Sequence, residues 1–175
     1  MFIKSKTVCF SGHRSKRLPK TAQDLEELKV KIYNEIDRAI ADGFDTFLYG
    51  GCYGFDLMCA ELVLLRRTVR KPGDPEQIRL YAAVPFEKQA EKWYAKDQEL
   101  YFNILKKCDG VIRLSEGFSL NCYNKRNEYM VDHSSRLICY YDGDSGGTSS
   151  TIKYANKNRL EIINLYDFVQ LTLWV

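Results

Sequence analysis

The sequence predicts an α/β fold in which an open, mostly parallel sheet of about six strands carries helices on both faces. Short apolar β-type runs alternate along the chain with longer segments whose apolar residues recur at helical spacing. Three glycine-bearing turns follow directly after such runs, at residues 11–14, 50–56 and 142–148. Strand–helix–strand units of this length form right-handed crossovers between parallel strands, so the predicted arrangement is Rossmann-like.

Apolar periodicity and stop signals define the elements in the first half of the chain. A short apolar strand is predicted over Thr7–Phe10, followed by a helix over Thr21–Asp42 that begins with a capping threonine and ends before a glycine. A second strand is predicted over Thr46–Tyr49 and a second helix over Leu57–Arg70. The prolines and glycine of residues 71–75 end that helix.

The second half continues the alternation. A third strand over Leu80–Val84 leads into a long helical region that reaches about Lys107, with an interruption near Ala95–Asp97. The remaining elements are a strand over Gly110–Leu114, a loop over Ser115–Cys122, a helix over Tyr123–His133, a strand over Arg136–Tyr141, a helix over Thr148–Asn158 and a strand over Glu161–Leu165. No repeat or linker divides this order, so residues 1–175 are predicted to form a single domain.

Composition narrows the function classes. The chain has 175 residues, 45% of them hydrophobic, which is enough for one well-buried core. The net charge of +3 permits an anionic ligand but lacks the strongly basic character of a dedicated nucleic-acid binder. No run approaches the roughly 18 apolar residues of a membrane span, and the N-terminus lacks a signal-peptide pattern. We therefore expect a soluble cytoplasmic protein without a membrane partner.

The six cysteines predict neither disulfides nor a metal centre. They are Cys9, Cys52, Cys59, Cys108, Cys122 and Cys139. Most fall within or beside predicted strands and helices, and none forms a C-x-x-C pair, so we expect reduced, buried thiols. Cys52, in a glycine turn, is the one candidate for an exposed thiol. We expect no metal site and no required cofactor.

The glycine turns predict a phosphate site. In a parallel sheet they lie at one carboxyl edge, where bare N–H groups and helix N-termini attract anions and glycine lets a phosphate approach the backbone. The chain contains neither G-x-G-x-x-G nor G-x-x-x-x-G-K-[ST], which disfavours a dehydrogenase or a P-loop ATPase. A phosphorylated small molecule, most simply a nucleotide, is the expected ligand.

Five motifs in a fixed order also resemble a known family. They are SGHR at residues 11–14, GGxxGxD at 50–56, PF at 85–86, YNxRNxxMVD at 123–132 and GGTxxT at 146–151. Together they resemble the YpsA-like branch of the SLOG superfamily, which unites DNA-processing Smf proteins with the Lonely Guy phosphoribohydrolases. The resemblance covers residues 7–165. It implies a Rossmann-like fold whose pocket takes a nucleotide-derived ligand such as ADP-ribose or NAD, in a protein that binds or senses it.

One motif departs from the phosphoribohydrolase pattern. Lonely Guy enzymes carry P-G-G-x-G-T-x-x-E, in which the glutamate assists cleavage of the N-glycosidic bond. Here Thr151 stands in place of that glutamate, and Asp144-Ser145 stand where the paired glycines would be. Threonine cannot act as the carboxylate base or stabilise an oxocarbenium-like charge. We therefore expect a binding protein and no inherited hydrolase mechanism.

The candidate ligand-binding residues come from the three turns and from the 123–132 motif. They are Ser11, Gly12, His13, Arg14, Gly50, Gly51, Gly54, Asp56, Arg126, Asn127, Gly146, Gly147, Thr148 and Thr151. Asp56 could accept a hydrogen bond from a ribose hydroxyl or cap the following helix. His13 could touch the ligand or be a structural group. Arg126 is interpreted as an exposed arginine that reaches a phosphate and contributes little to stability.

Two alternatives to a binding or sensing role remain open. A nucleotide N-glycosidase would need Glu61, Glu128 or Asp56 as its carboxylate, with Glu61 the leading candidate, although an exposed helical glutamate is the simpler interpretation of Glu61. Single-stranded DNA binding, as in Smf proteins, ranks last because basic residues cluster only over Lys4–Lys20. Nucleic acid is thus not an expected partner, whereas a homo-oligomer is left open. Trp93 is assigned to the core or to an interface.

Overall fold

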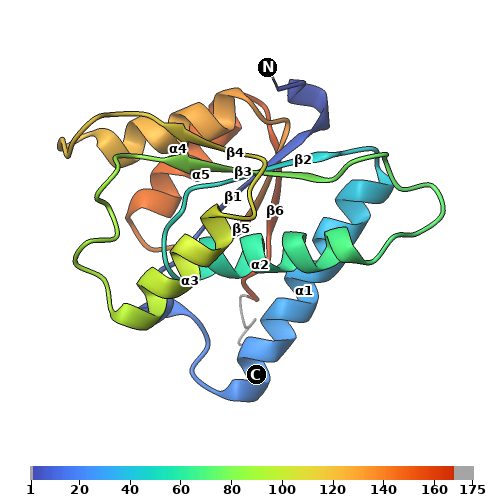
Figure 1. Ribbon diagram of the computed structural model, residues 1–175, viewed down its shortest axis with the longest axis horizontal. Coiled ribbons are helices and arrows are strands. Elements are labelled where there is room, and N and C mark those ends of the chain that lie inside the picture. The colour runs from blue at the N-terminus through green and yellow to red at the C-terminus, as the bar shows by residue number, and fades with distance from the viewer. Residues whose placement is uncertain (1, 168–175) are drawn as a thin grey trace, which may run out of the picture.

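The computed structural model describes residues 2–167, whose strands form one six-stranded sheet with every pair parallel (Figure 1). The strands are β1 (Thr7–Gly12), β2 (Thr46–Tyr49), β3 (Arg79–Val84), β4 (Gly110–Arg113), β5 (Arg136–Tyr140) and β6 (Glu161–Asn164). The helices are α1 (Ala22–Ala41), α2 (Phe55–Thr68), α3 (Ala95–Leu105), α4 (Cys122–Asp132) and α5 (Gly147–Lys157), with short 3-10 turns at Lys4–Lys6 and Ser15–Arg17. The predicted Rossmann-like fold class is confirmed.

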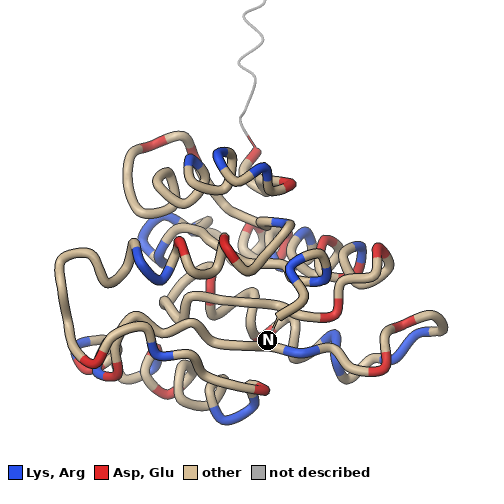
Figure 2. The backbone as a smooth tube through the Cα atoms, turned by 90° about the horizontal axis from the view of Figure 1, so that it is seen from above, with Lys and Arg blue, Asp and Glu red and all other residues tan. Residues whose placement is uncertain are grey.

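Basic and acidic positions are interspersed along the backbone (Figure 2). Three arginines among the described residues are nevertheless buried, Arg66, Arg126 and Arg136. Arg66, at the end of α2, donates to Asp37 and to Asp74, each at 2.6 Å. The hydrogen bond from Arg66 lowers the pKa of Asp74 to about 2, although its burial acts in the opposite direction. Because α2 runs back from the carboxyl edge of β2, this ion-pair cluster lies at the opposite edge of the sheet and fastens the α2–β3 connection.

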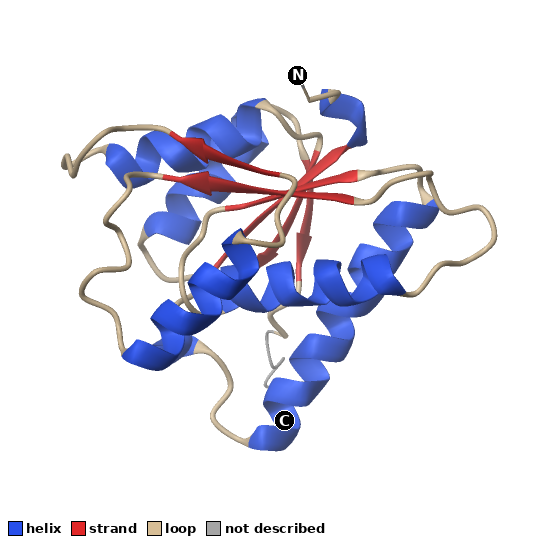
Figure 3. Ribbon diagram, viewed as in Figure 1, coloured by secondary structure: helices blue, strands red, loops and turns tan. Residues whose placement is uncertain are grey.

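Helices cover both faces of the sheet, α1, α2 and α3 on one side and α4 and α5 on the other (Figure 3). The alternation of side chains along a strand produces the two cores. In β1, Val8 and Phe10 belong to the cluster with Ile32 of α1, whereas Cys9 belongs to the cluster with Val131 of α4. A buried parallel strand is apolar on both faces, which explains the unbroken apolar run in β1.

The order of the strands across the sheet is β4-β3-β2-β1-β5-β6. The chain moves outward from β1 through β2 and β3 to β4, and then returns to the other side of β1 with β5 and β6. The connections after β1 and β5 therefore diverge at the carboxyl edge. A crevice at such a reversal of strand order is where open α/β sheets bind ligands.

The segment between β3 and α3 differs from the sequence-based prediction. A long helical region was expected to reach about Lys107, but α3 covers only Ala95–Leu105, and residues 85–94 form turns. Tertiary contacts override helical spacing here. The side-chain amide of Gln98 donates to the carbonyl of Ala90 at 3.0 Å, which satisfies a backbone group that lies outside a helix.

Three further findings concern the described residues. All six cysteines are free, with Cys52 and Cys108 half-buried and the other four buried. Burial raises the pKa of the Cys9 and Cys139 thiols to about 12.

Within residues 2–167 no helix is long and apolar enough to cross a membrane, and no cluster of three or more His, Cys, Asp or Glu side chains could hold a metal ion.

Candidate ligand-binding site

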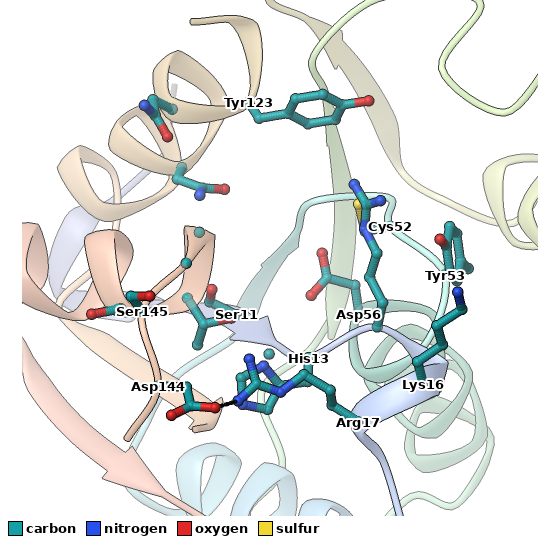
Figure 4. A pocket seen from close by; sticks show the side chains of 18 of the residues that line it. Ser11, His13, Lys16, Arg17, Cys52, Tyr53, Asp56, Tyr123, Asp144 and Ser145 are labelled. Carbon is teal, nitrogen blue, oxygen red and sulfur yellow. Dashed lines mark hydrogen bonds and ion pairs between the residues drawn. The ribbon is translucent and has the colours of Figure 1, made fainter. Parts of the chain in front are cut away.

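A pocket of about 470 Å³ lies at the carboxyl edge of the sheet, where the turns after β1 and β5 diverge (Figure 4). The end of β1 with its turn, the start of α2, the first turns of α4 and the start of α5 form its walls. The lining residues are Ser11, Gly12, His13, Arg14, Lys16, Arg17, Cys52, Tyr53, Asp56, Tyr123, Asn124, Arg126, Asn127, Asp144, Ser145, Gly146, Gly147, Thr148 and Ser149. They include every candidate ligand-binding residue except Gly50, Gly51, Gly54 and Thr151.

The N-terminus of α5 lines the pocket without a side-chain cap. Gly146 precedes the helix and has no side chain that could cap it. Its carbonyl accepts from the N–H of Ser150 at 3.0 Å. The first turn contains no acidic residue. The first N–H groups of a helix lack partners within the helix, and the aligned peptide dipoles place about half a positive charge there. This end of α5 is therefore suited to an anion.

The N-terminus of α2 is different, because the protein itself satisfies it. The N–H of Phe55 donates to the carbonyl of His13 at 3.1 Å, and the N–H of Leu57 donates to the carbonyl of Cys52 at 3.2 Å. A β-carbon on Gly54 would lie 2.7 to 2.8 Å from the backbone of Ser15 and Arg14. The N-termini of α2 and α5 are thus not equivalent, and that of α5 is the freer of the two.

Asp56 and Arg126 form a buried pair at the base of the pocket. Each side chain is only 6% exposed, and Nη1 of Arg126 lies 3.8 Å from Oδ2 of Asp56. Nη1 of Arg126 also donates to the carbonyl of Gly50, whereas its Nε is buried and has no hydrogen-bond partner within residues 2–167. The interpretation of Arg126 as an exposed side chain was wrong, because α4 turns it inward against the β2–α2 turn.

Burial dominates the electrostatics of Asp56. It raises the pKa of this carboxyl group to about 6, against the opposing effects of Arg126 and of the N–H groups of Cys52 and Gly50. Asp56 therefore changes its charge close to neutral pH. Its carboxylate can accept from hydroxyl groups, and the free Nε of Arg126 can donate to an oxygen, so together they suit a hydroxylated and phosphorylated ligand.

Arg14 sits between two aromatic rings that come from different segments. Its guanidinium carbon lies 5.2 Å from the ring centre of Tyr53 and 5.9 Å from that of Tyr123. Both distances lie within the range of cation–π attraction. Arg14 itself is exposed. Among the described residues, Arg14 and Lys16 line the pocket without an ion-pairing carboxylate, so their charge is available to an anion.

His13 and Arg17 join the turn after β1 to the turn after β5. Nε2 of His13 lies 2.9 Å from Oδ1 of Asp142, and Arg17 donates to Asp142. Arg17 also donates to Asp144 at 2.6 Å (Figure 4). Burial acts to raise the pKa of Asp142, but hydrogen bonds from the Asp144 N–H, Arg17 and His13 lower it on balance. Arg17 is thus already neutralised.

Three predicted glycines pack against the protein instead of lining the pocket. The carbonyl of Gly51 accepts from the side-chain amide of Gln89 at 3.2 Å. A β-carbon on Gly50 would collide with Arg126 and lie 2.7 Å from Oδ2 of Asp56. Together with Gly54, these glycines let the β2–α2 turn pack closely. A direct role for them in ligand binding stays a prediction.

The structure also separates Thr151 and Glu61 from the pocket. Thr151 is buried, and its hydroxyl donates to the carbonyl of Gly147 at 2.9 Å. Glu61 lies in a different hollow, with Leu65 and Lys107, on the side of α2 that faces α3. Burial raises the pKa of Glu61 there. Asp56 and Asp144 are the carboxylates among the lining residues of the pocket.

Several lining residues were not assigned as ligand-binding from the sequence. They are Lys16, Arg17, Cys52, Tyr53, Tyr123, Asn124, Asp144, Ser145 and Ser149. Each lies within three residues of a predicted site residue. Extending each predicted turn by one helical turn in both directions would have found them, because a turn that presents one residue to a crevice also brings its neighbours there.

A comparison with protein families matches residues 8–173 to the family described as the YspA SLOG family. The chain belongs to this family. Two curated relatives match most of its length. The SPbeta prophage-derived protein YoqJ of Bacillus subtilis is 31% identical over 147 residues, covering 77% of this chain and 83% of the relative. A UPF0398 protein of Staphylococcus aureus strain JH9 is 27% identical over 154 residues, covering 85% and 79%.

Solved structures extend the similarity to the fold. DNA processing protein A of Streptococcus pneumoniae matches 95% of this chain with a TM-score of 0.62 at 11% identity. This chain spans about half of that protein (52%). DNA processing protein A of Helicobacter pylori also matches 95% with a TM-score of 0.62, at 15% identity over 68% of its own length. At these identities the similarity concerns the fold alone.

Proposed function

We propose that this protein binds a nucleotide-derived ligand with a pyrophosphate, ADP-ribose, NAD or a similar molecule, and senses or sequesters it in the cytoplasm. One observation carries the proposal. A single pocket at the reversal of strand order combines the uncapped N-terminus of α5 with the buried pair of Arg126 and Asp56. A helix N-terminus and a guanidinium favour phosphate, and a carboxylate favours the hydroxyls of a ribose.

The arrangement suggests which group each residue would contact. Phosphate oxygens would accept from the N–H groups of Gly147, Thr148 and Ser149, with the charges of Arg14 and Lys16 nearby. Ribose hydroxyls would donate to the carboxylate of Asp56. A pyrophosphate is favoured over one phosphate because the cations and the helix N-terminus come from opposite walls of the pocket.

A binding role is favoured over N-glycosidase chemistry by the distribution of carboxylates. The position equivalent to the phosphoribohydrolase glutamate is Thr151, whose hydroxyl is engaged by the carbonyl of Gly147. Glu61 lines another hollow. Asp56 is held against Arg126, an arrangement that suits hydrogen bonding to a ribose better than proton transfer at the base.

Single-stranded DNA is the second candidate ligand. The Helicobacter pylori structure is described in terms of its single-stranded DNA binding mode, and this similarity does not support excluding nucleic acid. In this chain, Arg14 between Tyr53 and Tyr123 is the feature that would suit an unpaired base. We still propose the small ligand first, because acidic and basic positions are interspersed and Arg17 is engaged by two carboxylates.

The proposal is tested by thermal unfolding with ADP-ribose and with AMP. At a hundred times its dissociation constant, ADP-ribose should stabilise the fold by about 2.7 kcal/mol, and AMP should do so less at equal concentration. Arg14→Ala removes an exposed cation of the pocket, so it should melt near wild type and bind ADP-ribose about tenfold or more weakly.

Lys125→Ala is the matched control, since Lys125 is an exposed cation on α4 that does not line the pocket. It should leave the affinity for ADP-ribose unchanged. The absence of any stabilisation by ADP-ribose, NAD or AMP at millimolar concentration would refute the proposal. Equal losses in Arg14→Ala and Lys125→Ala would refute the assigned pocket.

A further inference from the structure

A second hollow, of about 560 Å³, adjoins the pocket across Tyr123. Phe86, Trp93, Phe118 and Tyr123 supply aromatic rings to it, and Gln89 also lines it. Tyr123 lines both the pocket and this hollow. Tyr123 is therefore a wall common to both cavities.

The aromatic rings beside the two cavities form two contacting sets. The ring of Phe86 lies 5.7 Å from that of Phe118 and 6.1 Å from that of Tyr123, in edge-to-face geometry. On the other wall, Trp93 lies 5.0 Å from Tyr53, which lines the pocket. Phe118 remains 66% exposed. An exposed ring beside buried ones provides a face on which a flat ligand group can stack.

Gln89 adds a hydrogen-bond acceptor without a partner. The residue is 5% exposed, and its Nε2 donates to the carbonyl of Gly51 at 3.2 Å and to the hydroxyl of Tyr101 at 3.1 Å. A backbone carbonyl can only accept, which fixes the orientation of the amide. Oε1 is therefore the free atom, and it is buried without a partner within the described residues. Such an acceptor calls for an N–H donor from a ligand.

We propose that this hollow is a nucleobase subsite, which takes the aminopurine of the same ligand whose pyrophosphate occupies the pocket. The proposal deepens the proposed function and rests on it. The base would stack on the aromatic rings, with Phe118 as its exposed wall, and its exocyclic amino group would donate to Oε1 of Gln89. An aliphatic chain would leave the acceptor unpaired, and a puckered sugar ring would cover the flat rings less completely than a planar base, so the chemistry favours a base.

The fluorescence of Trp93 provides a direct test. The chain has two tryptophans, and Trp174→Phe leaves Trp93 as the reporter. In that background, adenosine and ADP-ribose should quench the fluorescence, whereas ribose 5-phosphate, which has no base, should not. The dimethylamino analogue of adenosine lacks the amino hydrogens and should bind about tenfold more weakly.

Phe118→Ala should weaken binding of adenosine and of ADP-ribose about tenfold or more, and leave that of ribose 5-phosphate unchanged. Leu120→Ala, on the same loop, is the matched control, because Leu120 is 91% exposed and does not line the hollow. Its affinities should equal those of the parent. Both side chains are exposed, so neither variant should unfold the protein.

The outcomes separate this proposal from the proposed function. If ADP-ribose stabilises the protein without quenching Trp93 and without dependence on Phe118, the base subsite is refuted and the pyrophosphate pocket stands. If adenosine quenches through Phe118 but ADP-ribose binds no more tightly than adenosine, the subsite stands and the pyrophosphate pocket is refuted. If none of the three probes binds, both proposals fall.

Discussion

Asp56 is the residue whose chemistry depends most on its surroundings. On an exposed helix start it would be an ordinary capping carboxylate, ionised well below neutral pH. Buried beside Arg126, it has a pKa raised to about 6. Ionisation of Asp56 in the free protein therefore costs folding free energy. The contribution of Asp56 to the free energy of unfolding is highest below the ordinary pKa near 4 and falls as the pH rises through about 6.

The affinity for ADP-ribose should follow the charge of Asp56. The pyrophosphate of ADP-ribose keeps its charge between pH 5 and 7.5, while Asp56 goes from about one-tenth ionised to almost fully ionised. Because a carboxylate accepts better than a carboxylic acid, we expect affinity to rise about tenfold over this range, measured by calorimetry. Asp56→Asn should bind more weakly at pH 7.5 and lack this rise. An equal rise in Asp56→Asn would show that the dependence does not come from Asp56.

At the scale of elements, the glycine turns separate into two kinds. Gly50 and Gly54 are required because a β-carbon would strike neighbouring atoms, and Gly54 also has φ of +95°. Gly147 begins α5 at the pocket, and a β-carbon there would meet no atom within 4 Å. The first kind therefore serves packing, whereas the second leaves space beside free N–H groups.

Gly147→Ala tests whether α5 holds the phosphates. Alanine is the better helix former and meets no obstruction, so the free energy of unfolding should stay equal or rise by up to about 1 kcal/mol in urea denaturation. The added methyl narrows the approach to the first N–H groups of α5, so the affinity for ADP-ribose should fall about tenfold. Gly50→Ala, by contrast, should lose stability even without ligand. Wild-type affinity in Gly147→Ala would remove α5 from the phosphate site.

At the scale of the whole molecule, sequence patterns were sufficient to predict the fold. The alternation of apolar runs with helical periodicity predicted the parallel sheet, and the three turns pointed to the edge where the pocket lies. What the sequence could not supply were contacts across the chain. Arg126 is buried against a carbonyl and a carboxylate far away in sequence. In the non-helical segment 85–94, Gln89 donates to the carbonyl of Gly51, which is also far away in sequence.

The charge distribution of the whole molecule predicts how it should meet single-stranded DNA. Binding to phosphates releases counterions, and the logarithm of the affinity falls with the logarithm of salt by about 0.7 per contact on single strands. Around the pocket, Arg14, Lys16 and Arg17 are the basic lining residues other than the buried Arg126, and Arg17 is already paired with Asp142 and Asp144.

We therefore expect a labelled thymidine oligonucleotide to bind weakly, with a slope no steeper than about −2 in fluorescence anisotropy between 50 and 200 mM salt. This slope corresponds to a loss of affinity of roughly tenfold. ADP-ribose should displace any bound oligonucleotide, since the same cations would serve both. Submicromolar affinity with a slope of −4 or steeper, unaffected by ADP-ribose, would require a basic surface outside the pocket. That result would favour DNA as the ligand over a free nucleotide.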